Sequence, residues 1–469
     1  MSCSKVFRPS VLALCCTFVC VNVGAQDSLD SLDGLSFDNI GFDDAFFETE
    51  PSNTPAWLEP FSFRLSQQIY AQVNSHGSEL ADGSLYKKTA KTENNRLSLL
   101  TRYQNPFAAG WLLQASGQAK IYWPGDYEYR ANDRQVDTEF RLNELFVQRS
   151  SNDNSLKLGA QTVVWGENIG NSVLDVINTS EFRDLTIIDI EDARLNQWLL
   201  VWDHFDDNRQ ISSFINLYPE FNPPPVRGSP FFFEPAFNLT DYRRDKALFE
   251  LGSQIRWSIA GSDLSLMGAY LYENQLHYSP PSNGVGDAET TANDYLLLGV
   301  SANRAIGKLL LNLDIAYSHD ILVDALWSSS LSASGPKLIT LGVNKLGATA
   351  GLEYAINNDQ NIMVGVSAES LLNSSDKLES DQTLLADSNT GNALLRYSNS
   401  MRNGDAQLAV TIQSALDAAS LLASVSLNYT LTDNLAIMSQ IIATRAAPDS
   451  ALAVLDEDVR MGMTLTWSF

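Results

Sequence analysis

A strict alternation of apolar and polar side chains in the last twelve residues, DVRMGMTLTWSF, restricts the fold of this chain more than any other feature. One face of this segment holds Val459, Met461, Met463, Leu465, Trp467 and Phe469. The other face holds Arg460, Gly462, Thr464, Thr466 and Ser468. Because successive side chains of a β-strand point to opposite sides, a period of two predicts a strand with one apolar face and one polar face. An edge strand of a soluble β-sandwich and a strand that crosses a lipid bilayer both fit this pattern.

Recurrence of the alternation favours the membrane strand. It returns in 61–73, FSFRLSQQIYAQV, where Arg64 falls on the polar row, and in 251–259, LGSQIRWSI, where Arg256 does. Each segment reaches the length of about 9 to 11 residues that a tilted strand needs to cross a bilayer. Beyond the first 25 residues, no apolar run is long enough for a membrane helix. A membrane chain built from strands must close into a barrel, because lipid offers no partner for unpaired backbone groups. The polar rows then face a wet interior.

The links between the alternating segments have two lengths, which follow each other along the chain. They include short links at 150–154 and 357–360 and long links at 167–194 and 220–246. Bacterial outer-membrane barrels keep short turns in the periplasm and long loops outside. Counting over 61–469 in this way predicts an antiparallel β-barrel of about 18 strands with both ends in the periplasm. The link 416–419 is short where a long one is due, and the weak segment 394–402 leaves a barrel of about 16 strands as the alternative.

The start of the chain predicts secretion. Residues 1–25 combine Lys5 and Arg8 with an apolar core and end in small residues, as a cleaved signal peptide does. An uncleaved membrane helix is the alternative interpretation. All four cysteines lie in this stretch. The rest of the chain therefore has no thiol for disulfides, metal sites or nucleophilic catalysis.

Residues 26–60 form an acidic segment between the signal peptide and the barrel at 61–469. The segment holds nine Asp and Glu residues and four Phe, with no Lys or Arg. This composition predicts a flexible periplasmic extension. We expect either a solvated leader or a peptide that binds a periplasmic partner or enters the pore.

Composition and motifs argue against other classes of function. With 31 basic and 56 acidic residues, and a formal net charge of −25, the chain is a poor partner for nucleic acid. The four histidines, His76, His204, His277 and His319, fall in different links or strand ends, and the sequence holds no GxSxG or HExxH motif. We therefore expect no enzyme activity and no catalytic residues. We also expect no cofactor and no dedicated metal site, since no link has the ordered spacing of metal ligands, but weak binding of Ca²⁺ or Mg²⁺ by acidic residues of the outer links, such as Asp189, Glu191 and Asp192.

One link is too long for a turn. Residues 159–185 read GAQTVVWGENIGNSVLDVINTSEFRDL, and the alternation ends near Trp165. Links of such length are usually functional or disordered. One interpretation folds this link into the pore and makes it a constriction. The constriction residues are then Trp165, Glu167, Asp175, Arg183 and Asp184. The other interpretation places Trp165 in an aromatic girdle and leaves the link at the surface.

The same stretch carries a family resemblance. GAQTVVWGE followed by VLDVINTSEFRDL resembles the G-R-Q-x-V-x-W-G-E and D-x-x-N-P-x-D pattern of a poorly characterised, porin-like group of proteobacterial outer-membrane barrels, similar in plan to the alginate-export porins. Ala160 stands where that group has Arg, and Thr179 where it has Pro. The first difference removes a charge from the pattern. The resemblance implies an outer-membrane channel or a partner of an export system, without fixing a substrate.

The polar rows predict how such a pore would select solutes. They point six bases into the lumen, Arg64, Arg141, Lys157, Arg256, Lys345 and Arg460. The acidic link 167–194 faces them. A narrow place lined by both signs favours dipolar or amphiphilic solutes. The link 218–237, rich in Pro and Phe, favours apolar or aromatic solutes or contacts with lipopolysaccharide, unless its phenylalanines only pack links together.

Together these patterns predict an integral β-barrel of the Gram-negative outer membrane that acts as a passive channel for small solutes, apolar or amphiphilic ones included. Two alternatives stay open. The barrel could serve an envelope export or lipid-transport system that docks on its N-terminal segment, or be a structural or adhesive surface protein. Trp467 and Phe469 resemble the C-terminal signal that the barrel-assembly machinery reads. Expected partners are therefore that machinery, outer-membrane lipid and lipopolysaccharide.

Overall fold

The computed structural model describes residues 57–79, 85–88, 90–126, 137–166, 172–181, 183, 193–224, 244, 246–279, 289–327, 337–380, 382–384, 387–416, 419–448, 450 and 452–469. Several expectations from the sequence fall outside these residues. They concern the signal peptide at 1–25, nearly all of the acidic segment at 26–60, Glu167, Asp184 and most of the Phe-rich link.

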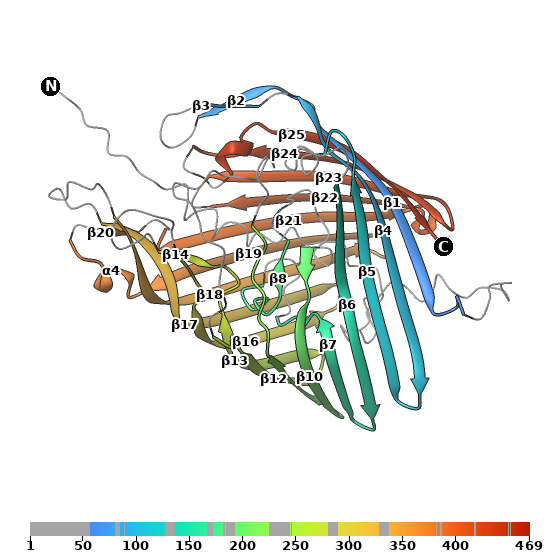
Figure 1. The fold of residues 1–469 in the computed structure, drawn as a ribbon, viewed down its shortest axis with the longest axis horizontal. Coiled ribbons are helices and arrows are strands. Elements are labelled where there is room, and N and C mark those ends of the chain that lie inside the picture. Colours follow the sequence, from blue (N-terminus) through green and yellow to red (C-terminus); the bar gives the residue numbers. More distant parts are fainter. Residues whose placement is uncertain are drawn as a thin grey trace.

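Eighteen strands of the described residues form one closed antiparallel barrel (Figure 1). The first half of the ring contains β1 (Phe61–Gln72), β4 (Lys91–Ala108), β5 (Trp111–Tyr122), β6 (Asp137–Ser151), β7 (Asn154–Gln161), β10 (Gln197–Asp206), β11 (Arg209–Asn216), β12 (Glu250–Ile259) and β13 (Ser262–Tyr272). The second half contains β16 (Asp294–Ile306), β17 (Leu309–Trp327), β18 (Lys337–Asn357), β19 (Gln360–Leu372), β21 (Asn389–Met401), β22 (Ala406–Ala415), β23 (Ser420–Thr432), β24 (Leu435–Arg445) and β25 (Val459–Ser468). Each strand pairs with the next one in this order, and β25 pairs with β1.

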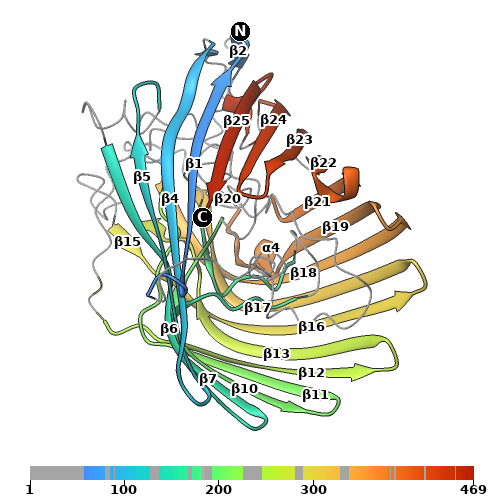
Figure 2. The same ribbon diagram turned by 90° about the vertical axis from the view of Figure 1, so that its right-hand side faces the viewer.

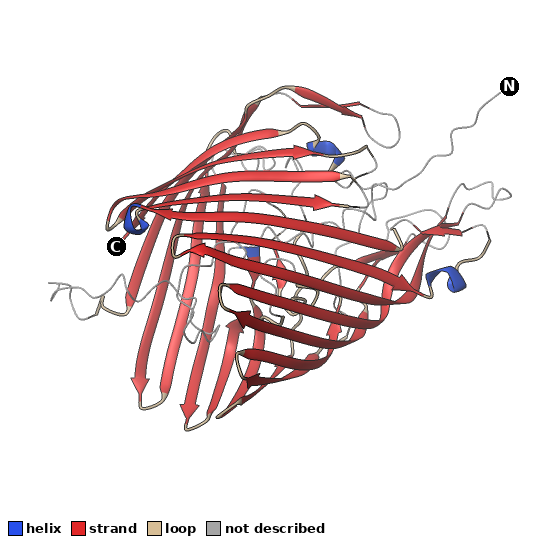
Figure 3. Cartoon of the chain, turned by 180° about the vertical axis from the view of Figure 1, so that it is seen from behind, coloured by secondary structure: helices blue, strands red, loops and turns tan. Residues whose placement is uncertain are grey.

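Shorter elements lie in the links and turns (Figures 2 and 3). They are β2 (His76–Glu79), β3 (Leu85–Lys88), β8 (Thr179–Ser180), β9 (Arg194–Leu195), β14 (His277–Ser279), β15 (Glu289–Thr291), β20 (Gln382–Leu384), α4 (Ser374–Lys377), η3 (Arg402–Gly404) and η4 (Ala453–Leu455). β20 extends the sheet by pairing with the end of β17. Within the described part of the chain, no helix has the length and apolar character to cross a membrane.

The predicted barrel of about 18 strands is confirmed. The alternative of about 16 strands is wrong, because the weak segment 394–402 falls largely in β21. This strand pairs with β19 on one side and with β22 on the other. The link 416–419 joins β22 to β23 at the end of the barrel where the long links lie. The link is therefore short although it lies at the end of the barrel where the alternation of short and long links places a long loop.

The two faces of the strands point as the alternation predicts. On β25, Met463 and Trp467 are 51% and 49% exposed on the outer surface, whereas Arg460 is 4% exposed. On β1, Ile69 is exposed and Tyr70 is buried. A barrel in lipid needs this arrangement, because the outward row meets hydrocarbon and the inward row meets the lumen.

Closure depends on the seam between the first and last strands, whose register pairs Arg64 with Ser468 and Gln72 with Arg460. Phe63 and Phe469 exchange both backbone hydrogen bonds, each 2.9 Å long, and their rings stack with centroids 5.4 Å apart. The terminal aromatic thus belongs to the seam itself. Its recognition by the assembly machinery stays a prediction.

Tyr70 and Gly462 form a second contact across this seam. They are direct cross-strand partners, and the buried Tyr70 ring occupies the space that a Cβ at Gly462 would need. The Tyr70 hydroxyl donates a 2.6 Å hydrogen bond to Gln440 Oε1 on β24. An aromatic ring laid over a strand glycine shields the exposed backbone and helps to pin the register.

We expect Gly462→Val to weaken barrel closure. The new side chain must displace the Tyr70 ring, and overpacking of this kind costs about 1 to 3 kcal/mol or more. The measurement is the fraction of heat-modifiable barrel after refolding at increasing urea concentration. Gly268→Val is the matched control, because a Cβ at Gly268 would meet nothing closer than Leu298 Cδ2 at 3.6 Å. Equal urea midpoints for the two variants would refute a special role for the seam glycine.

Candidate functional site

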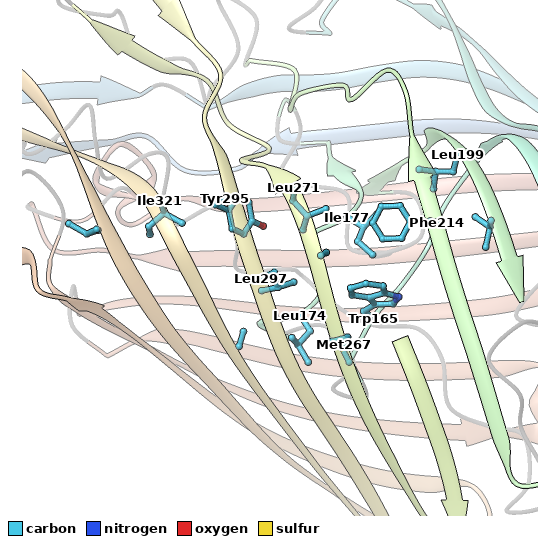
Figure 4. Packing of buried hydrophobic residues seen from close by; sticks show 14 of the residues in the cluster. Trp165, Leu174, Ile177, Leu199, Phe214, Met267, Leu271, Tyr295, Leu297 and Ile321 are labelled. Carbon is cyan, nitrogen blue, oxygen red and sulfur yellow. The ribbon is translucent and has the colours of Figure 1, made fainter. Parts of the chain in front are cut away.

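The link between β7 and β10 leaves the barrel wall and enters the lumen. We call residues 162–196 the lumen loop, of which 162–166, 172–181, 183 and 193–196 are described. Trp165, Leu174 and Ile177 of this loop are between 0% and 1% exposed and belong to one apolar cluster with side chains of the inner wall (Figure 4). The loop is therefore packed against the inside of the barrel.

Small residues of the wall make room for the loop. Trp165 lies over Gly252 of β12, where a Cβ would come within 2.7 Å of the indole, and its ring is 5.5 Å from that of Phe214 on β11. Leu174 occupies the space over Gly299 of β16. Val173 lies over Gly347 of β18 in the same way, 3.1 Å from where a Cβ of residue 347 would be. We call these three glycines, Gly252, Gly299 and Gly347, the seat of the loop. The loop thus crosses the inner wall from β11 to β18.

The wall under the loop is apolar, contrary to the expectation of a uniformly wet interior. Met267, Leu271, Tyr295 and Leu297 point inward from β13 and β16 and are buried in the cluster with the loop. An apolar inner row is costly in water, and the loop removes it from water. The sequence carries a signal for this, because LMGAYLY and YLLLGV are apolar on both faces of their strands.

The residues of the WGE stretch shape the start of the loop. Gly166 has a φ of 97°, and a Cβ there would collide with the Ser172 side chain, so glycine is required at this position. Ser172 Oγ accepts a 3.1 Å hydrogen bond from the backbone N–H of Leu174. Trp165 belongs neither to an aromatic girdle nor to the surface that a solute would meet. Its placement makes it an anchor of the loop.

Polar side chains hold the loop in shape. Asn178 closes it by a double contact with the backbone of Val163, accepting from its N–H at 3.0 Å and donating to its carbonyl at 2.8 Å. Asp175 forms an ion pair with Arg194, with Oδ2 and Nη2 2.8 Å apart. Both Asp175 and Asn178 belong to the D-x-x-N part of the family-like stretch. Asp175, predicted to face solutes, is thus occupied in a structural pair.

A charged cluster lies on the neighbouring wall. We call Lys120 and Tyr122 of β5, Glu139 and Arg141 of β6, and Glu181 and Arg183 of the lumen loop the polar wall. Arg183 Nη2 is 2.8 Å from Glu139 Oε1 and also pairs with Glu181 at 2.5 Å. Arg141 Nη1 is 3.7 Å from Glu181 Oε2. Hydrogen bonding to Glu181 and the charges of both carboxylates raise the pKa of Arg183 against the opposing effect of burial, so this loop side chain stays charged.

Arg183 and Arg141, two of the predicted constriction residues, therefore both contact Glu181. Lys120 was not among the predicted residues. Lys120 is the cross-strand partner of Glu139. The signal for it is present in WLLQASGQAKIY, where Gln114, Ser116, Gln118 and Lys120 alternate with apolar residues. Among the described residues, the polar wall thus combines Lys120, Arg141 and Arg183 with Glu139 and Glu181.

Among the remaining predicted lumen bases, Lys345 pairs with Glu369 at 3.0 Å, and the other four separate into two groups. Arg64, Lys157 and Arg256 are half-buried inward residues in the half of the barrel with the short turns, away from the loop. Lys157 Nζ lies 6.0 Å from the Phe146 ring centroid. Arg460 differs, because it is buried and paired with Glu93 at 3.2 Å and Asp458 at 2.8 Å. Its charge is compensated within the wall, and its place on the pore lining stays a prediction.

Comparisons with known proteins inform the fold alone. No protein-family model matches the chain, and no curated protein matches it in sequence. Among solved structures, OccAB1 of Acinetobacter baumannii is 9% identical with a TM-score of 0.51, over 87% of this chain and 96% of that one. OccAB3 of the same organism is 11% identical with a TM-score of 0.49, over 87% and 98%. The outer membrane channel DcaP of that organism is 10% identical with a TM-score of 0.41, over 87% and 96%. The chain has the closed antiparallel β-barrel fold of Gram-negative outer-membrane channels and porins.

Proposed function

We propose that this protein is a passive channel for small solutes across the outer membrane and that the lumen loop forms its constriction. The observation that carries this proposal is the seating of the loop on the inner wall, from Trp165 over Gly252 to Val173 over Gly347. A loop that only covered the barrel surface would not need an apolar seat inside. A loop fixed there narrows the passage at a defined depth.

The solute class follows from the chemistry on the two sides of the passage. The loop and its seat present an apolar side, extended by the partly buried Val176, Leu341 and Leu371. The polar wall presents Lys120, Arg141 and Arg183 with two carboxylates. Charges of both signs across a narrow section produce a transverse field, which orients dipolar molecules. We infer that amphiphilic solutes with a charged or dipolar head and a small apolar body pass best.

We expect Gly299→Val to unseat the loop. The new methyl groups would occupy the position of Leu174, and overpacking of about 1 to 3 kcal/mol is enough to displace a packed segment in a large fraction of molecules. Single-channel recordings in planar bilayers should show higher and noisier conductance than wild type. Gly365→Val is the control, because Gly365 also faces inward but its Cβ would meet only Leu394 Cβ at 3.8 Å. Identical traces from both variants would exclude the loop as the constriction.

We also expect the polar wall to set charge selectivity. Neutralising Lys120 and Arg141 together by Gln should shift the reversal potential in a KCl gradient toward cations. The change in permeability ratio should be about fivefold, since a unit charge about 4 Å away contributes on the order of 1 kcal/mol even in water. Arg64→Gln with Arg256→Gln removes the same charge from a section without the loop, and its shift should be smaller. An equal or larger shift in that control would place the selective section elsewhere.

The same recordings separate the channel from a structural or adhesive barrel. Purified wild-type protein that is heat-modifiable, and therefore folded, should give discrete conductance steps. A folded barrel that gives no steps would refute the channel and favour the structural alternative.

A further inference from the structure

A neighbouring link on the outer side of the barrel holds the lumen loop in place. Asn274, just after β13, donates from Nδ2 to the carbonyls of Val176 at 2.9 Å and Asn178 at 2.8 Å. Its own backbone carbonyl accepts a 2.8 Å hydrogen bond from Asn222. Asn222 Oδ1 in turn accepts one of 2.8 Å from the backbone N–H of Ser180. The Asn274 side chain thus binds two backbone carbonyls of the lumen loop, and Asn222 of a second link binds the loop at a third position.

The position of Asn274 depends on the residue before it. Glu273 Oε1 accepts hydrogen bonds from the backbone N–H of Leu322 on β17 at 2.8 Å and from Asn293 Nδ2 at 2.6 Å. Its other oxygen, Oε2, lies 3.3 Å from His277 Nε2. The Glu273 carboxylate therefore joins both ends of its own link to β17.

His277 supplies the positive charge of this junction. The charged groups that face it are Glu273 of its own link and Asp324 of β17. Burial disfavours the imidazolium, but the contact with Glu273 and the charges of both carboxylates outweigh burial and raise the pKa of His277. Protonated His277 keeps Glu273 and Asp324 from repelling each other. Neutral His277 leaves two carboxylates together.

We infer that Asn274 is a positioning residue for the constriction and that protonated His277 secures it, so that the outside pH controls how firmly the lumen loop is held. The inference rests on the proposed channel function. A group whose folded pKa is raised stabilises the structure fully below its ordinary pKa, which for His is about 6.5. That stabilisation is lost as pH rises through the folded pKa. The loop is therefore held firmly in acid and loosened in alkali.

The test is a pH titration of single-channel behaviour. Wild-type channels in planar bilayers with KCl should show few transitions to higher conductance when the outer compartment is at about pH 5.5. Their frequency should rise by about pH 9, because neutral His277 no longer bridges Glu273 and Asp324. The same change of pH in the periplasmic compartment should have a smaller effect, because the junction lies on the outer side.

Two variants separate the parts of the inference. His277→Gln should abolish the pH step and show frequent transitions at acidic pH. Asn274→Ala should show frequent transitions at every pH, because the contacts with Val176 and Asn178 are gone. His319→Gln is the matched control. His319 lies on β17 and contacts Asn344 Oδ1 at 2.8 Å, so this variant should keep the wild-type step.

The outcomes are distinguishable. A wild-type channel that conducts without a pH step overturns the inference and leaves the channel function standing. A step that persists in His277→Gln, or that disappears in His319→Gln, also overturns it. Folded wild-type protein that never conducts contradicts the proposed function instead. Heat-modifiability identifies variants that fail to assemble. If His277→Gln fails to assemble, the pH titration of the wild-type channel still tests the inference.

Discussion

The hydrogen bonds between β1 and β25 are the condition on which the rest of this structure depends. An open sheet in lipid would leave two edges of unpaired N–H and C=O groups, each costing several kcal/mol. Only the pairing of the two strands that are farthest apart in the chain removes both edges. The seam reinforces this pairing with side chains, through the stacked rings of Phe63 and Phe469 and the ring of Tyr70 over Gly462. Closure fixes the register of all other strands, and with it the face to which each side chain points.

A barrel of this size creates a second problem, because its interior is too wide for its own side chains to fill. Where no loop enters, the inward row is mostly polar. Where the lumen loop lies, the row is apolar, and the wall carries glycine at the points of closest approach, Gly252, Gly299 and Gly347. The loop and this sector therefore form one apolar core inside a polar lumen. The apolar contacts fix where the loop lies, and the hydrogen bonds of Asn178 and Asn274 fix its backbone shape.

The sequence predicts the strands of the barrel wall well and the structure of the lumen loop poorly, for physical reasons. Every strand crosses the same boundary between lipid and lumen, so a period of two recurs and even weak β21 can be counted from the links on either side of it. The loop obeys no such period. Its hydrogen bonds join residues such as Val176 and Asn274, which are far apart in sequence, so no local pattern reveals them. Arg183 and Arg141 were predicted at the site from the sequence. Lys120 was recognised there only from the strand register, and the anchoring role of Trp165 only from the folded loop.

Charge counts can mislead about such a lumen for a related reason. The chain has a formal net charge of −25, yet several of its lumen positions are basic. What a passing solute experiences depends on which of these bases is already compensated. Arg460 is buried at 4% exposure between Glu93 and Asp458, so its field is largely cancelled within the wall. In the polar wall, Lys120, Arg141 and Arg183 lie beside the loop together with Glu139 and Glu181. Exposed charges in a wide lumen are screened over about 8 Å at physiological salt. Under the proposed constriction, the field therefore acts beside the lumen loop and not along the whole barrel.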